Sequence, residues 1–189
     1  MKRLFLLFCL LTLPATFFTA YALSPGDEID SFNGVIVYHN DGVNNTYGRN
    51  TVDGYNLGLK YQCVEFVKRY YYERFNHKMP ETYGHAKDFF DHSVKDGALN
   101  AARNLLQYKN EGRSKPQVDD LLVMHGGSGI LQQYGHVAIV SAVGKDYIEL
   151  VQQNMGASRM KLPLVERGAV WYVDNTAVLG WLRRAEQSR

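Results

Sequence analysis

The second half of the chain consists of short apolar segments of the kind that form β-strands. After Pro116, six such segments are separated by Gly, Asp or Asn residues: residues 121–125, 136–143, 147–153, 159–164, 169–173 and 177–183. No helical pattern alternates with them, which excludes a parallel, doubly wound sheet and favours an antiparallel one. An earlier run, Gly34–Tyr38, has the same β-type character, and residues 40–59 are predicted to form a loop rich in Asn and Gly.

The helical patterns lie before this series of strands. From Cys63 onward, apolar side chains recur at helical spacing, while polar residues such as Glu65 and Arg69 occupy the other side of the predicted helix. These two residues form an i,i+4 pair in the favourable order. Two further helices are predicted at His85–Val94 and Ala98–Leu106. N-terminal helices followed by an antiparallel β-sheet indicate an α+β fold.

The first 22 residues have the layout of a secretory signal peptide. Two basic residues precede an apolar run at residues 4–13, and Ala20-Tyr21-Ala22 supplies the small-x-small motif for cleavage. An uncleaved N-terminal anchor is the alternative, although the apolar run is short for a membrane span. We therefore expect a periplasmic or secreted protein with one domain over residues 23–189, where nothing resembles a linker or a repeat.

Removal of this segment changes the charge of the protein. The 189 residues carry a formal charge of +2, from 21 basic and 19 acidic side chains. The first 22 residues hold two of the basic side chains and none of the acidic ones, so processing leaves 19 of each and no net charge. A neutral chain without basic clusters has no electrostatic footprint for nucleic acid. We expect no nucleic-acid partner, no stable membrane insertion after processing, and a monomer.

Processing also removes Cys9 and leaves Cys63 as the single thiol. No His-Glu-x-x-His spacing or second cysteine is left to build a zinc site, so we expect neither a metal nor a cofactor. A lone cysteine in an oxidising compartment is buried and inert, paired with another chain, or kept for its reactivity. Cys63 stands at the predicted N-terminus of a helix, where backbone N–H groups favour the thiolate, and this makes it a candidate nucleophile.

A cysteine nucleophile needs a base, and His136 is the candidate. His77, His85 and His92 lie in polar stretches typical of a solvated surface. His136 instead follows Gly135 and begins a buried strand. The alternative for such a residue is a core histidine whose hydrogen bonds are satisfied.

Two strings in the sequence resemble the CHAP family of cysteine, histidine-dependent amidohydrolases/peptidases. They are Tyr61-Gln62-Cys63-Val64-Glu65-Phe66, followed by Lys68-Arg69, and Gly135-His136-Val137-Ala138-Ile139-Val140. The likeness is strongest to the amidase domain of glutathionylspermidine synthetase/amidase. A weaker likeness extends over most of the mature chain, at Gly34-Val35, Gln153-Asn154 and Leu179-Gly180-Trp181.

The resemblance implies a papain-like (NlpC/P60-like) cysteine hydrolase fold, with Cys63 as nucleophile and His136 as base. Where family members carry an acidic residue, usually Glu, and then an Asn, this chain has Gln152 and Asn154. Gln152 can orient the imidazole, but it cannot supply a negative charge to stabilise imidazolium. Asn154 is a candidate for a supporting hydrogen bond. The resemblance also implies an oxyanion hole made by the backbone N–H of Cys63 and the side chain of Gln62.

Glu149 is the acidic residue nearest to these positions in the sequence. Side chains alternate along a strand, so Gln152 shares a face with Ile148 and Leu150, and Glu149 points to the other face unless a bulge intervenes. We therefore keep Gln152 as the residue that orients His136.

The sequence thus predicts an exported cysteine amidase or endopeptidase that hydrolyses an amide bond through a thioester acyl-enzyme. The expected substrate is the peptide part of peptidoglycan. A second hypothesis is a glutathionylspermidine-type amidase, against which the export signal argues because that substrate is cytosolic. A third is a catalytically silent CHAP-like binding module, which the replacement of the acid by Gln152 would explain.

Overall fold

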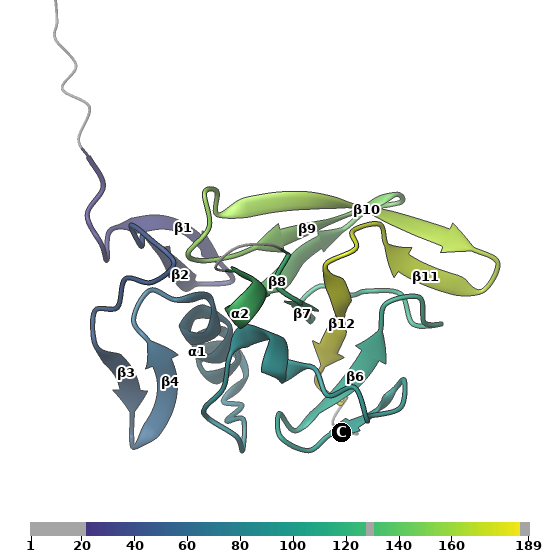
Figure 1. Cartoon of the computed structure of the whole chain (residues 1–189), viewed down its shortest axis with the longest axis horizontal. Coiled ribbons are helices and arrows are strands. Elements are labelled where there is room, and N and C mark those ends of the chain that lie inside the picture. The colour runs from purple at the N-terminus through teal and green to yellow at the C-terminus, as the bar shows by residue number, and fades with distance from the viewer. Residues whose placement is uncertain (1–21, 128–130, 186–189) are drawn as a thin grey trace, which may run out of the picture.

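The computed structural model describes residues 22–127 and 131–185, so the predicted signal peptide lies outside the described residues except for Ala22. Within them, an eight-stranded antiparallel sheet forms the larger part of the molecule (Figure 1). Its spatial order is β11-β10-β9-β8-β7-β12-β6-β5. The strands are β5 (Ala98–Asn100), β6 (Leu105–Lys109), β7 (Leu121–Met124), β8 (His136–Val143), β9 (Tyr147–Val151), β10 (Arg159–Arg167), β11 (Val170–Val173) and β12 (Val178–Arg183).

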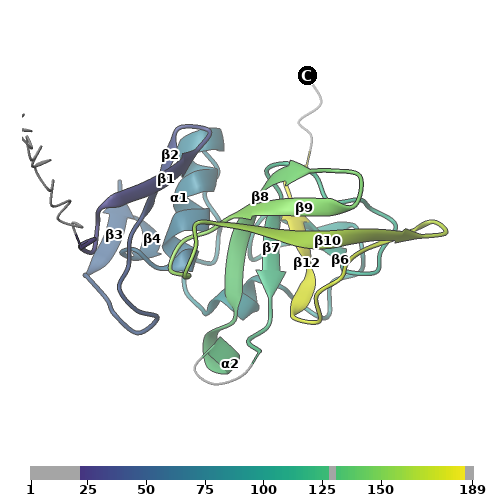
Figure 2. The same cartoon turned by 90° about the horizontal axis from the view of Figure 1, so that it is seen from above.

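Two hairpins and the one long helix of the described residues precede this sheet. The hairpins are β1 (Glu28–Phe32) with β2 (Val35–Tyr38), and β3 (Arg49–Val52) with β4 (Tyr55–Leu59). Helix α1 (Cys63–Phe75) contacts β2, β4 and β8, and therefore lies between the hairpins and the large sheet (Figure 2). A 3₁₀ helix, η1 (Ala86–Phe89), packs on β7 and β8, and α2 (Leu131–Tyr134) lies between those strands in the chain. None of the described helices is long and apolar enough to cross a membrane.

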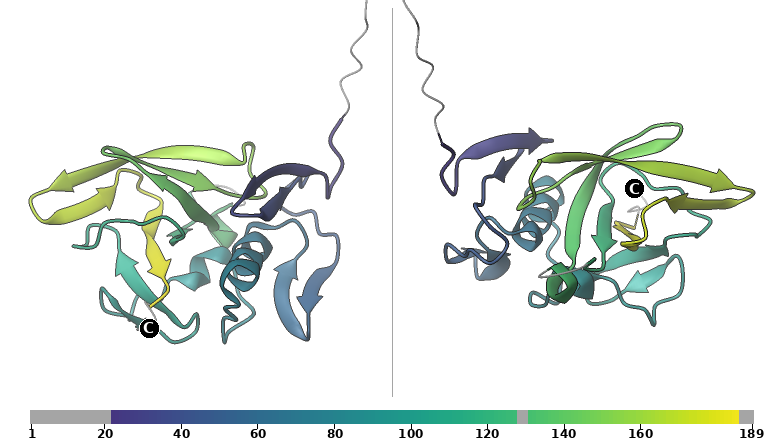
Figure 3. Two further views of the ribbon diagram at one scale, coloured as in Figure 1. Left: turned by 180° about the vertical axis from the view of Figure 1, so that it is seen from behind. Right: turned by 45° about the horizontal axis from the view of Figure 1, so that its top comes forward.

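The central strands β7 and β8 are mostly apolar because both of their faces are largely buried, although β8 also carries His136 and Ser141. In β7, Leu121 and Val123 belong to the cluster that includes the apolar face of α1, whereas Leu122 and Met124 belong to a second cluster around Trp181. Strands β6, β8, β9, β10, β11 and β12 also contribute residues to this second cluster. Figure 3 shows the curved course of the sheet in two views. The sheet therefore serves as a shared wall between two cores.

The curvature of the sheet brings its outer strand back towards the connection that follows β6. Trp171 of β11 forms an isolated antiparallel bridge with Gly112, and its backbone N–H donates to the Gly112 carbonyl at 2.8 Å. The Asn110 side chain adds a hydrogen bond to the carbonyl of Val173 at 3.1 Å. The second core is thus closed by the strands themselves and needs no covering helix.

The sequence predicted α1, β2 and the six later strands, but two of the predicted helices were wrong. Residues 85–94 contain only the 3₁₀ helix η1, and residues 98–106 form β5, a turn and the start of β6. The turn uses Asn104 at φ +52°. Buried Asn100 donates to the carbonyl of Phe89 at 3.0 Å, so tertiary contacts override the helical composition of this stretch.

The predicted loop at residues 40–59 also proved to be partly regular, because it contains the β3–β4 hairpin. Asp53 and Gly54, between the two strands, have φ values of +49° and +74°. Two successive residues with positive φ are typical of a type I′ hairpin turn. The result is a mixed fold of helix and mostly antiparallel sheet, in which the sheet predominates and a single long helix replaces the predicted series.

The polar side of α1 is buried as well, contrary to a simple amphipathic helix. Glu65, Lys68 and Arg69 are all buried. Gly58 in β4 allows the hairpin to approach this side closely, because a Cβ at its position would lie 3.2 Å from the Cα of Glu65. Its φ of +133° is also one that glycine adopts readily. The start of α1 is therefore enclosed by β4 on one side and by the sheet on the other.

Candidate active site

A pocket of about 510 Å³ lies at the N-terminal end of α1. Four of the predicted site residues line it: Gln62, Cys63, His136 and Asn154. The fifth, Gln152, is buried and contacts His136 from outside the lining. Among residues 22–127 and 131–185, no group of three or more His, Cys, Asp or Glu side chains could hold a metal ion.

Cys63 is the first residue of α1 and is half-buried. Burial raises the pKa of its thiol, and the backbone N–H groups of Val137, Val64 and Cys63 itself lower that pKa to a smaller extent. The contribution of Val137 places the thiol against β8, next to His136 in the chain. The position of Cys63 at a helix N-terminus, taken alone, predicts that its thiolate is favoured over the thiol. In the folded chain, desolvation outweighs that effect and favours the thiol.

His136 begins β8 and is buried. Its Nε2 lies 3.0 Å from Oε1 of Gln152, whose Nε2 donates to the carbonyl of Ala157 at 3.0 Å. The amide nitrogen of Gln152 is oriented towards Ala157, so its oxygen faces the imidazole and accepts a hydrogen bond from the N–H of His136 Nε2. In the neutral imidazole, Nδ1 is then the free base.

The protonation state of His136 follows from the same contacts. Burial lowers the pKa of His136 to about 4, and the hydrogen bond to Gln152 raises it by less than burial lowers it. At neutral pH the imidazole is therefore uncharged. Together with the raised pKa of Cys63, this gives a thiol and a neutral imidazole as the resting pair.

Glu149 does not contact His136. Its Oε1 accepts hydrogen bonds from Ser141 at 3.0 Å and from Arg159 at 3.4 Å. A register shift is present in β8 between Val140 and Ala142, opposite this part of β9. Despite that irregularity, the carboxylate of Glu149 is held by Ser141 and Arg159.

Gln62 and Asn154 contact each other at the edge of the pocket. Asn154, at φ +62°, donates from Nδ2 to Oε1 of Gln62 at 2.5 Å. Gln62 in turn donates from Nε2 to the carbonyls of Val43 at 3.0 Å and Asn45 at 2.7 Å. Both N–H bonds of the Gln62 amide are thus directed at the loop after β2. The N–H of Cys63 belongs to the first turn of α1, and an N–H group in this turn has no hydrogen-bond partner within the helix.

Gln153, which sequence reasoning noted only as part of the likeness, connects the two halves of the site. It is fully buried, and its Nε2 donates to the carbonyl of Gln62 at 3.0 Å and to Glu65 Oε2 at 2.9 Å. Its Oε1 accepts the backbone N–H of Tyr38 at 2.8 Å. One side chain therefore links the start of α1, the end of β2 and the segment after β9.

Glu65 completes this buried network. It accepts from Arg69 Nε at 2.7 Å and from Asn50 Nδ2 at 2.8 Å, in addition to Gln153. Arg69 also donates to the carbonyl of Ile36 at 2.8 Å. The sequence offered a partial signal for this network, because the Glu65–Arg69 pair directly follows Cys63.

His85 also differs from its expected surroundings. It was predicted as a solvated surface residue, and although it is exposed it lines the pocket and stacks edge-on against Tyr134, with ring centroids 5.0 Å apart. The sequence alone gave no indication that the segment leading into η1 would face Cys63.

Comparison with known proteins agrees with this arrangement. The model of the CHAP domain matches residues 53–154, and the chain therefore belongs to the CHAP domain family. The matched range contains Cys63, His136 and Gln152. Membership of this family implies hydrolysis of an amide or peptide bond.

Three similar proteins each contain a much longer chain. The chain is 29% identical over 147 residues to trypanothione synthetase of Crithidia fasciculata, covering 71% of this chain and 22% of that protein. It is 31% identical over 143 residues to glutathionylspermidine synthase of the same organism, covering 67% and 19%. It is 24% identical over 163 residues to the bifunctional glutathionylspermidine synthetase/amidase of Escherichia coli K12, covering 80% and 26%. The chain thus spans about a quarter of these relatives or less.

The raised pKa of Cys63 predicts slow alkylation at neutral pH. In protein comprising residues 23–189, iodoacetamide should label Cys63 at a rate that rises only above the range of an ordinary thiol, about pH 8.5. Mass spectrometry across a pH series measures this rate, with Cys63→Ala as the blank. An alkylation rate that is already at its maximum at about pH 6 would mean that the resting form of Cys63 is a thiolate.

The buried contacts of Gln153 predict a large loss of stability when they are removed. We expect Gln153→Ala to lower the free energy of unfolding by about 2–4 kcal/mol, because buried Glu65 and the partly buried backbone groups of Gln62 and Tyr38 lose their partner. Urea denaturation followed by circular dichroism measures the change. The matched control is Gln117→Ala, whose exposed side chain should cost less than about 0.5 kcal/mol. Similar small effects of both substitutions would contradict the assigned role of Gln153.

Proposed function

We propose that this chain is an exported cysteine amidase or endopeptidase that cleaves an amide bond through a thioester on Cys63. The observation that carries the proposal is the pocket lined by both Cys63, at the start of α1, and His136, whose Nε2 lies 3.0 Å from Gln152 Oε1. A nucleophile, a base and a group that orients the base are the elements of a cysteine hydrolase site. The arrangement supports the papain-like relationship suggested by the sequence.

In the proposed reaction, His136 Nδ1 removes the proton of the Cys63 thiol while the sulfur attacks the substrate carbonyl carbon. The backbone N–H of Cys63 stabilises the oxyanion of the tetrahedral intermediate. The imidazolium then donates its proton to the leaving nitrogen, the C–N bond breaks, and the acyl group remains on sulfur as a thioester. His136 next takes a proton from water as the water oxygen attacks the thioester carbon. The C–S bond then breaks and the imidazolium returns its proton to sulfur, which releases a carboxylic acid and restores the Cys63 thiol.

Gln152 acts in this scheme as a positioning residue. It keeps His136 in the tautomer that leaves Nδ1 free, but no carboxylate lies there to stabilise the imidazolium. Proton transfer and attack are therefore expected to occur together, starting from a neutral pair. This separates the proposed mechanism from one that begins with a stable thiolate–imidazolium pair.

We infer a substrate outside the cytoplasm, and the peptide part of peptidoglycan fits best. The support is the predicted signal peptide, which implies a periplasmic or secreted protein. We further propose a monomer that acts without a metal, a cofactor or a nucleic acid. The second candidate, cleavage of glutathionylspermidine or a similar conjugate, is favoured by the name of the similar bifunctional synthetase/amidase.

The deciding assay uses residues 23–189 and the Cys63→Ala variant, each incubated with purified peptidoglycan and separately with glutathionylspermidine. Mass spectrometry should find peptidoglycan products with a new amine and a new carboxyl group, and Cys63→Ala should yield none. Cleavage of glutathionylspermidine alone would favour the second candidate. Cleavage of neither substrate, or cleavage that survives Cys63→Ala, would contradict the proposed function.

The neutral orienting group predicts a pH effect for Gln152→Glu. The active form needs neutral His136, whose pKa lies at about 4, so wild-type kcat/KM should fall only as the pH approaches that value. A carboxylate beside His136 stabilises the imidazolium and raises the pKa, so the acid limb of the profile should move to higher pH. The control is Glu149→Gln, on the Ser141 side, which should leave the limb in place. An unchanged limb in Gln152→Glu would contradict the assignment.

A further inference from the structure

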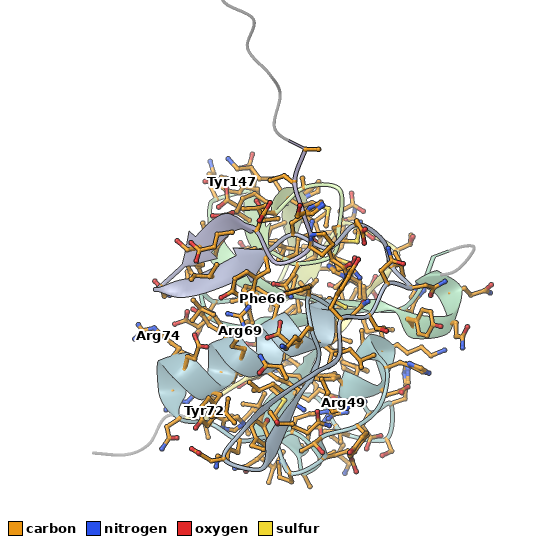
Figure 4. All side chains as sticks on the ribbon, turned by 90° about the vertical axis from the view of Figure 1, so that its left-hand side faces the viewer. Arg49, Phe66, Arg69, Tyr72, Arg74 and Tyr147 are labelled. Carbon is orange, nitrogen blue, oxygen red and sulfur yellow. The ribbon has the colours of Figure 1, made fainter. Side chains whose placement is uncertain are left out.

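The charge of the pocket lining comes from one residue. Among the described residues that line the pocket, Arg49 is the only Asp, Glu, Lys or Arg side chain. Arg49 begins β3, where it pairs with Leu59 of β4, another lining residue (Figure 4). Because the lining contains this positive charge and no acidic side chain, this part of the pocket favours a negatively charged substituent.

The guanidinium of Arg49 is held in place by neutral groups. Its Nη1 donates to Oδ1 of Asn56 at 3.0 Å, and its Cζ lies 5.3 Å from the ring centroid of Tyr83. No carboxylate oxygen of residues 22–127 and 131–185 lies within 4.0 Å of it. The side chain is therefore anchored without being neutralised, and further guanidinium donors remain for a ligand.

Two more cations lie behind the same wall of the pocket. Buried Lys68 donates to the carbonyls of Asn56 and Thr82, the latter at 3.0 Å. Buried Arg103 donates to the backbone carbonyls of Glu81 at 2.7 Å and Asp88 at 3.1 Å. In the part of the chain that the structure describes, neither has a carboxylate partner within 4.0 Å.

The three cations influence one another. Burial first, and then the positive charges of Arg103 and Arg49, lower the pKa of Lys68 to about 8, while the charge of Glu81 opposes them weakly. The segment formed by Thr82, Tyr83 and Gly84 lines the pocket over these cations. The charges of Glu81 and Asp88 act on Arg103 as well, so the three cations outnumber these acids by one. An anion at this end would therefore enter an excess of positive charge, and an amine would be repelled.

We propose that this end of the pocket binds a free carboxylate of the substrate, with Arg49 as the specificity-determining contact. The inference rests on the proposed function, since the carboxylate belongs to the molecule whose amide carbonyl reaches Cys63. The planar guanidinium matches a carboxylate through paired N–H donors, and Asn44 and Thr46 add polar groups to the lining beside it. The substrate class is an acidic peptide, and a polyamine portion would have to lie elsewhere.

The first test uses Cys63 as a reporter and needs no knowledge of the substrate. Bromoacetyl derivatives of glycine, γ-aminobutyrate and ε-aminocaproate, each compared with its carboxamide, alkylate Cys63 with loss of bromide. In residues 23–189, we expect at least one acid to react faster than its carboxamide, on the order of fivefold. Higher ionic strength should reduce the preference.

Arg49→Gln should abolish that preference and leave the carboxamide rate unchanged, which also verifies that the thiol environment is intact. The matched control, Arg167→Gln, removes an exposed arginine that rests on Tyr172, with 4.8 Å between Cζ and the ring centroid, and it should keep the preference. Equal rates for acid and carboxamide at every length, or a preference that survives Arg49→Gln, would overturn the proposal.

The second test uses peptidoglycan peptides with free or amidated carboxylates. Arg49→Gln should raise KM for the free acid several-fold and leave kcat nearly unchanged, and amidation of the peptide should mimic the variant. If the wild-type protein cleaves no peptide, the proposed function fails, and the labelling ratio still decides whether the anion site exists. If it cleaves both peptides with equal KM in wild type and variant, the function stands and the carboxylate site is wrong.

Discussion

The hydrogen bonds of Gln153 hold together the two parts of the chain that carry the candidate catalytic residues. On one side they reach the carbonyl of Gln62 and the carboxylate of Glu65, which flank Cys63. On the other side, Gln153 directly follows Gln152, which contacts His136. Most of these groups are buried, so any displacement would leave several of them without partners, at a cost of about 1–3 kcal/mol each. The relative position of thiol and imidazole is therefore fixed by an amide that takes no part in the reaction.

The charge arrangement around this network explains the chemistry proposed for the pocket. Glu65 and Arg69 form an ion pair within α1 at 2.7 Å, and neither charge is among the causes of the shifted pKa of Cys63. Gln152 adds a dipole but no charge to His136. The nucleophile and base consequently rest in neutral forms. Arg49, Lys68 and Arg103, which have no carboxylate within 4.0 Å among the described residues, lie at the other wall of the pocket. Reactivity and substrate attraction are thus assigned to separate groups.

The sequence predicted those parts of the fold in which local pattern and tertiary environment agree. Strands such as β7 and β8 are apolar because both faces are buried, and α1 begins at Cys63 as expected. The β3–β4 hairpin was missed because Arg49-Asn50-Thr51-Val52 has no apolar alternation and is held mainly by its turn and by the polar contacts of Asn50. A helix was wrongly predicted at residues 98–106 because their Ala-rich composition favours helix. In the structure, Asn100 is held by a buried partner outside its own segment, the carbonyl of Phe89.

For the candidate site, the sequence identified Cys63 and His136 and showed that Gln152 replaces the usual acidic residue. It did not predict the contacts that position these side chains. Gln153 lies 91 residues from Gln62 and 88 from Glu65, and no local pattern relates such distant positions. Arg49 and His85 gained their place at the pocket only when the hairpin and the segment leading into η1 folded around α1. The pKa of Cys63 could not be predicted either, because it depends on burial as well as on the helix terminus.

The claim that the chain reacts through a thioester on Cys63 is tested most directly by trapping that intermediate. Turnover of a peptide substrate in the presence of hydroxylamine should yield the acyl hydroxamate in proportion to hydroxylamine, while the rate of amine release stays limited by acylation. Mass spectrometry of the products would detect the hydroxamate, and Cys63→Ala should form neither it nor the free amine. Amine release without any hydroxamate, or hydroxamate formed equally by Cys63→Ala, would contradict the account.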